Sequence, residues 1–164
     1  MKKADSLATI EKTLQNDPAT RRAFLGSDKR SLAEILRADA AIVRRRGLNH
    51  ARIAQRMLAL RQAGWSGQGE VVAVPPHFAV KVEAERGYLA CPFGDEGAVA
   101  KVNTTVRNLA RGLEITFSNL NIHLIAAHRF YEGRGAKFRL DPGQLIETLA
   151  ISRRVSGAAS GRHR

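Results

Sequence analysis

"VNTTVRNLARGLEITFS", residues 102–118, separates a mixed α and β fold from an all-helical one. Threonine, valine and asparagine dominate its first half, and these residue types are poor helix formers. The tripeptide ARG at 110–112 lies between two β-rich runs, which is the arrangement of two strands joined by a glycine-containing turn. The alternative is a helix continuing from residues 95–101. We favour the strands and predict a β-hairpin.

A second hairpin is predicted immediately upstream, in residues 78–93. Phe78, Val80 and Val82 alternate with other residues, so they lie on one face of a strand. The tripeptide ERG at 85–87 predicts a turn, and a returning strand would then run through Tyr88 and Leu89.

Downstream, Ser118 or Asn119 is expected to cap a helix that ends at Gly133. Residues 136–140 predict a short strand, and Asp141 followed by Pro142 predicts the start of a last helix that continues to the beginning of the tail. The residues from 152 to 164 are predicted to be a flexible basic tail.

The N-terminal part predicts helices within residues 4–17, 17–26, 31–47 and 49–64. Each has an amphipathic pattern or a capping residue at its start, and Asp17, Ser31 and Asn49 are the expected caps. Residues 65–78 contain glycines, a serine and a Pro-Pro pair that interrupt regular structure. We therefore predict an α+β protein with a helical, helix-turn-helix-like subdomain at 1–66, an α+β subdomain of antiparallel hairpins and two packed helices at 67–151, and the tail.

Charge is distributed unevenly along the chain. The formal net charge is +12, and residues 1–66 contribute 14 Lys and Arg against 6 Asp and Glu. Residues 67–151 contain 9 of each sign, and the tail adds four arginines. Such a field attracts phosphate polyanions, acidic proteins or anionic lipid, and nucleic acid is the commonest intracellular polyanion.

The helix pair at 31–64 has the pattern of a helix-turn-helix element, in which Gly47 forms the turn and Ile53 lies one turn into the second helix. The alternative is a generic helical hairpin with solvated arginines. If the element binds DNA or RNA, the side chains expected at bases and phosphates are Arg44, Arg45, Arg46, His50, Arg52, Gln55, Arg56 and Arg61.

A second group of cations surrounds Gly133 and Gly135. Arg134, Lys137 and Arg139 could hold a phosphate backbone there, with Phe130 and Tyr131 nearby for stacking. The alternative is a surface turn followed by an edge strand that positive charge protects from pairing.

Cys91, His123 and His128 are candidate metal ligands. Four residues separate the two histidines, which matches the spacing of histidine ligands in small zinc sites, and Asp95 or water could complete four ligands. On a straight helix, however, the two rings would point about 140° apart. The alternatives are a buried structural cysteine beside a core histidine, or a Cys91 nucleophile activated by a histidine.

These observations favour a nucleic-acid-binding protein, in which the hairpins could also form a homodimer contact. The first alternative is a small metal-dependent or thiol enzyme, and the second is an adaptor for an acidic protein. The chain has one cysteine, no stretch long and apolar enough to span a membrane and no secretory pattern at its first residues, so we expect a cytoplasmic protein. Glycine-rich residues 64–70 lack the lysine and Ser or Thr of a phosphate-binding loop.

Overall fold

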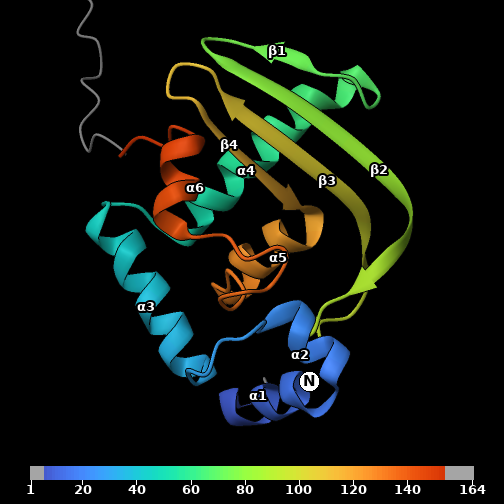
Figure 1. Cartoon of the computed structure of the whole chain (residues 1–164), viewed down its shortest axis with the longest axis vertical. Helices are drawn as coiled ribbons and strands as arrows, with labels where there is room; N and C mark the ends of the chain where they lie inside the picture. Colours follow the sequence, from blue (N-terminus) through green and yellow to red (C-terminus); the bar gives the residue numbers. More distant parts are fainter. Residues whose placement is uncertain (1–5, 154–164) are drawn as a thin grey trace, which may run out of the picture.

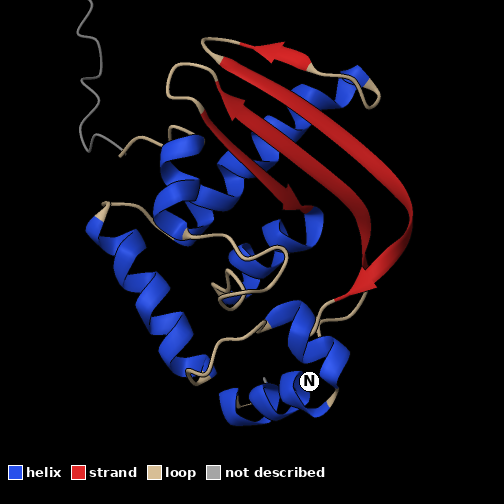
Figure 2. Ribbon diagram, in the orientation of Figure 1, coloured by secondary structure: helices blue, strands red, loops and turns tan. Residues whose placement is uncertain are grey.

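The computed structural model describes residues 6–153 as a mixed α+β fold with one antiparallel sheet (Figures 1 and 2). The strand order is β1-β2-β3-β4. Its elements are α1 (Leu7–Asn16), α2 (Pro18–Phe24), α3 (Leu32–Arg45), α4 (His50–Gly64), a 3₁₀ turn η1 (Trp65–Gly67), β1 (Val72–Val74), β2 (Phe78–Ala90), β3 (Ala98–Asn108), β4 (Leu113–Ser118), α5 (Asn119–His128) and α6 (Pro142–Thr148).

The predicted helix starts are confirmed by their capping bonds. The side chains of Asp17, Ser31, Asn49, Ser118 and Asp141 each accept a hydrogen bond from a backbone N–H in the first turn of the helix that follows. Such bonds satisfy donors that have no partner within the helix. Short-range chemistry therefore fixes these helix starts.

The hairpin at 102–118 is also confirmed. β3 pairs antiparallel with β4, and Val106 lies opposite Ile115. The connection ends at Gly112, whose φ of 65° is a left-handed conformation that glycine adopts without steric cost. Val106 and Phe117 are fully buried against the helices on one face of this sheet.

The predicted turn at 85–87 is wrong. β2 runs through these residues as one strand of 13 residues, and its pairing with β3 shifts register between Ala84 and Tyr88. Gly87 has a φ of 106°, so it serves a β-bulge in the strand instead of a turn. The chain reverses later, in residues 91–97, and the hairpin joins β2 to β3.

Three predictions about the C-terminal part are also wrong. α5 ends at His128, because Arg129 adopts a left-handed conformation with φ 58° and caps the helix. Residues 136–140 form no strand, and α6 ends at Thr148. The segment at 129–141 makes its bonds elsewhere: Gly133 N donates to Phe24 O at 2.8 Å, and Arg139 pairs with Asp39 of α3.

Two apolar clusters hold the fold together. The first lies between the sheet and α4, α5 and α6, and it contains Met57, Leu60, Phe78 and Phe117. Residues from both predicted subdomains, 1–66 and 67–151, contribute to this cluster. The second cluster joins α1–α3 to α5 and to the loop at 91–97, with Leu14, Ile35, Phe93 and Phe130 among its members.

α4 lies beneath the sheet in Figure 1, in contact with β1, β2, β3 and α5. The helix-turn-helix-like character of the N-terminal part is not confirmed, because this helix is a central element of the core. Within residues 6–153 no helix has the length and apolar character needed to cross a membrane. Residues 154–164 of the predicted tail lie outside the described residues.

Candidate metal centre

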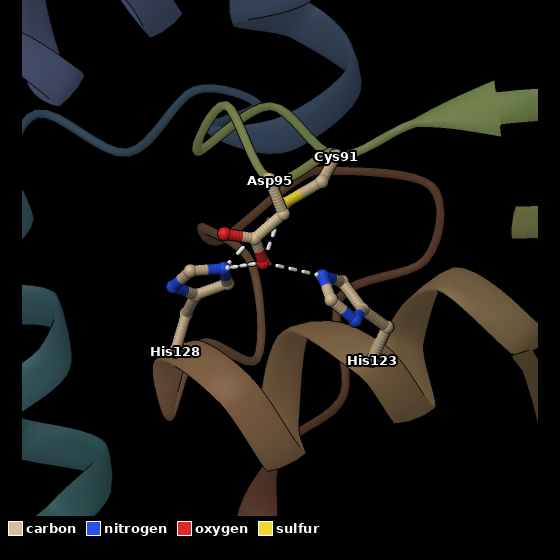
Figure 3. Close-up of side chains that lie close together, drawn as sticks. All are labelled: Cys91, Asp95, His123 and His128. Atoms are coloured by element: carbon tan, nitrogen blue, oxygen red, sulfur yellow. Dashed lines mark hydrogen bonds and ion pairs between the residues drawn. The ribbon is translucent and has the colours of Figure 1, made fainter. Parts of the chain in front are cut away.

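Cys91, Asp95, His123 and His128 converge at the tip of the β2–β3 hairpin (Figure 3). Cys91 follows the last residue of β2, Asp95 lies in the loop at 91–97, and both histidines lie on α5. Gly94 and Gly97 in that loop have φ values of 90° and 88°. These conformations tighten the loop and bring the carboxylate back beside the thiol.

One carboxylate oxygen is the meeting point of the group. The Nε2 atoms of His123 and His128 lie 2.8 Å and 2.6 Å from the same atom, Asp95 Oδ2. Cys91 Sγ lies 3.6 Å from that oxygen and 3.5 Å from His128 Nε2. One donor atom from each of the four residues lies within 4.8 Å of every other.

The histidines converge although a straight helix predicts that they diverge. His128 is the last residue of α5, and its ring stacks on Phe93 with centroids 4.2 Å apart. The two imidazole rings meet edge to face at 5.6 Å between centroids. The Asp95 side chain extends from the loop at 91–97 to a position between the two rings. It therefore bridges the distance that the helix leaves between the two histidines.

Burial raises the pKa of both acidic groups, whereas the neighbouring side chains add to this shift at Cys91 and oppose it at Asp95. Cys91 is only 8% exposed, and burial is the main reason that the pKa of its thiol is raised, with the Asp95 carboxylate adding to the effect. Burial also pushes the pKa of Asp95 upward, but hydrogen bonds and charge from His128 and the bond from His123 outweigh it. The pKa of Asp95 is therefore lowered.

Thiolate, imidazole and carboxylate are the donors of tetrahedral zinc sites. With ordinary zinc bond lengths, sulfur and nitrogen ligands lie about 3.6 Å apart and nitrogen and oxygen ligands about 3.3 Å apart. The observed 3.5 Å between Cys91 Sγ and His128 Nε2 fits the first value. The two distances to Asp95 are those of hydrogen bonds, and each would lengthen by about half an ångström around an ion. The residues present fit zinc.

The structure brings together all three metal candidates that the sequence indicated, together with Asp95. The candidate nucleic-acid-binding residues of α4, in contrast, make separate contacts. His50 Nδ1 lies 2.9 Å from the Tyr131 hydroxyl, and Arg56 Nε donates to Leu149 O at 3.0 Å. Two guanidinium groups lie over rings, Arg56 over Phe78 and Arg61 over Trp65. Arg52 is half-buried and Gln55 is exposed.

The cations after α5 also have different surroundings. Arg134 and Lys137 are exposed, whereas Arg139 is half-buried and donates to both carboxylate oxygens of Asp39. Arg139 therefore belongs to an internal ion pair. At the end of α3, Arg44, Arg45 and Arg46 are exposed.

Sequence reasoning missed two polar groups. Glu132 is buried with a φ of 68° and accepts a hydrogen bond of 2.8 Å from Asn121 Nδ2. The second group is Arg111, which shares Glu147 with Arg46, and Arg153, which lies against Gly47. No periodic pattern indicates either group, because both depend on contacts between segments far apart in the sequence. Comparison with protein-family models, with curated proteins and with solved structures finds no match to this chain.

Proposed function

We propose that this protein binds one zinc ion through Cys91, Asp95, His123 and His128, and that the ion has a structural role. One observation carries the proposal: a thiol and a carboxylate from the loop at 91–97 and two imidazoles from α5 direct their donor atoms to one point. Histidine pairs on carboxylates are common, but the added thiol within 3.6 Å makes the set characteristic of zinc.

A structural role fits the number and position of the ligands. Structural zinc sites are filled by four protein ligands, whereas catalytic sites keep one position for water or substrate. The ion would join the hairpin tip to the end of α5. Cys91 and Phe93 belong to the second apolar cluster, so the same ion would support the docking of α1–α3.

Metal analysis tests the proposal directly. We expect purified full-length protein to contain about one zinc per chain, and Cys91→Ser and His123→Ala to lose most of it. His77→Gln is the matched control, because His77 is a half-buried histidine outside the cluster. Zinc content that is equal in all four proteins would contradict the assignment.

Cobalt substitution adds a test of the ligand set. Co²⁺ in a tetrahedral site with a thiolate ligand absorbs through sulfur-to-metal charge transfer. We expect this absorption in the wild type and its loss in Cys91→Ser, while His77→Gln retains it. A six-coordinate spectrum without charge transfer would show that Cys91 is not a ligand. An enzyme, the alternative role, requires an open coordination position, which a water ligand on the cobalt of the wild-type protein would reveal.

We propose nucleic-acid binding as a second function. Arg44 and Arg45 are exposed and form no ion pair with any residue of the described segment 6–153, in a protein with a net charge of +12. Their charge is available to a polyanion. Salt-dependent binding of labelled oligonucleotides tests this function, and the absence of binding at about 0.15 M salt would exclude it.

A further inference from the structure

The end of α3 lies beside α6, and arginines from two other segments meet it there. Arg46 Nη2 lies 3.0 Å from Glu147 Oε1 of α6, and Arg111 Nη2, from the β3–β4 turn, lies 4.0 Å from Glu147 Oε2. Glu147 thus connects α3 to the turn after β3. These contacts place two guanidinium groups on either side of one carboxylate.

Arg153 comes to the same place from the chain after α6. A β-carbon built on Gly47 would lie 2.4 Å from Arg153 Nε, so this side chain passes directly over the turn after α3. Gly47 has a φ of 69° and lies two residues after the last residue of the helix. We call Arg44, Arg45, Arg46, Arg111 and Arg153 the arginine cluster.

Acidic side chains compensate only part of this charge. Glu147 is shared between Arg46 and Arg111. Asp141 is the second carboxylate nearby, since both its Oδ2 atom and Arg46 Nη2 lie within 3.6 Å of a β-carbon built on Gly143. Arg46 and Arg111 therefore share these two carboxylates, and the Arg153 side chain is exposed. Arg44 and Arg45 directly precede Arg46 and are also exposed, so the end of α3 and the segments beside it carry an excess of about three positive charges.

We infer that the arginine cluster binds the phosphate backbone of nucleic acid. This inference rests on the second function proposed above and assigns it to a surface. Guanidinium groups bind phosphate oxygens through two parallel hydrogen bonds, and several on one face can follow successive phosphates. Arg153 is also followed in the sequence by Arg154, Arg162 and Arg164, which extend the basic segment.

The arginine cluster shares Arg44, Arg45 and Arg46 with the surface that the sequence suggested, but it does not include the residues of α4. On α4, Arg56 donates within the fold and Arg61 lies over Trp65, so that helix does not present a row of free cations. The arginine cluster also lacks a projecting helix that could enter a groove and read base edges. Contacts to phosphates alone carry no base sequence information. Binding should therefore depend strongly on salt and little on sequence.

A pair of double variants tests the location. Arg44→Ala with Arg45→Ala removes two charges from the arginine cluster. Arg21→Ala with Arg22→Ala, on α2, removes the same charge from another exposed pair of the N-terminal helices. Fluorescence anisotropy of a labelled 20-base-pair duplex and of one of its strands is measured with full-length proteins across a series of salt concentrations.

We expect the α3 double variant to bind the duplex roughly 30-fold more weakly at 0.15 M salt, because each lost phosphate contact costs about a factor of five at that concentration. The slope of log K against log salt should flatten by about 1.8. For the α2 double variant, the slope should differ from the wild-type slope by less than about half of that change. Far-ultraviolet circular dichroism and thermal unfolding check that both variants fold.

Three results would overturn the inference, and they differ in meaning. Equal weakening in both double variants would refute the arginine cluster as the site and leave nucleic-acid binding itself standing. No binding by the wild type at physiological salt would remove the second function as well. Equally tight binding of labelled polyglutamate would identify an acidic protein as the partner in place of nucleic acid.

Discussion

Glu132→Gln should remove a large part of the pH dependence of stability. Glu132 is 3% exposed, and burial raises the pKa of its carboxyl from 4.5 to about 8, although the bond from Asn121 and the charge of Arg139 oppose this change. The folded protein therefore keeps a proton on Glu132 between pH 4.5 and pH 8, while the unfolded chain releases it. Because the folded state binds more protons there, the free energy of unfolding falls as the pH rises.

The magnitude follows from the two pKa values. Each pH unit between them lowers the free energy of unfolding by about 1.4 kcal/mol, so the loss from pH 5 to pH 8 amounts to about 3.5 kcal/mol. The stabilisation is complete below pH 4.5 and is lost through pH 8. Glutamine has nearly the same shape, can accept the bond from Asn121 and does not titrate. The stability of the Glu132→Gln protein should therefore lack this pH-dependent contribution.

Urea unfolding at half-unit steps from pH 5 to pH 8.5 measures the effect. Other groups titrate equally in both proteins, so the difference between wild type and Glu132→Gln isolates this carboxyl. The variant should gain about 3.5 kcal/mol relative to wild type across the range. Glu85→Gln, at an exposed position of β2, is the control and should follow the wild type. Parallel curves for wild type and Glu132→Gln would refute the reasoning.

Three further predictions concern stability. Chelation should lower the free energy of unfolding of wild type by about 2.7 kcal/mol relative to protein with free zinc at 100 times its Kd, and should leave Cys91→Ser unchanged in a thermal unfolding assay. Asp39→Asn should cost about 3–5 kcal/mol in urea unfolding, because it leaves the half-buried Arg139 without its carboxylate partner, and Arg139→Met in the same chain should recover part of this. Gly26→Ala should cost about 2 kcal/mol more than Gly69→Ala, since both glycines have positive φ but only a β-carbon at Gly26 would lie 2.3 Å from a backbone atom; equal costs would contradict that explanation.

Local interactions explain which parts of the fold could be predicted. Capping side chains such as Asp17 and Ser31 bond to a backbone N–H three residues ahead, so the sequence contains both partners. The bend at Gly87 is different, because a left-handed glycine serves a turn or a bulge equally well. Pairing with β3, ten or more residues later, selects the bulge.

The continuous strand β2, found in place of the predicted turn, also explains how the metal centre forms. A turn at residues 85–87 would have sent Cys91 back along the sheet, whereas the continuous β2 carries it to the hairpin tip beside α5. Residue types and the histidine spacing identified the ligands. Their convergence depended on the loop that brings Asp95 between the rings, which no spacing rule describes. The surroundings of Arg56 could not be predicted either, since its guanidinium group lies over Phe78 and its Nε atom donates to Leu149 O, both far from it in the sequence.

Backbone hydrogen bonds join the beginning of the fold to a segment more than 100 residues later. Gly133 N donates to Phe24 O, and Ser27 N donates to Arg134 O at 3.0 Å. During synthesis on the ribosome, α1 and α2 emerge long before these partners exist. The apolar residues of both helices therefore stay without their contacts until α5 and the loop at 91–97 have been made. These two helices are thus made before their partners and are among the last to dock. Contacts of such long sequence separation slow folding, so the newly made N-terminal helices would be the segment most in need of a chaperone.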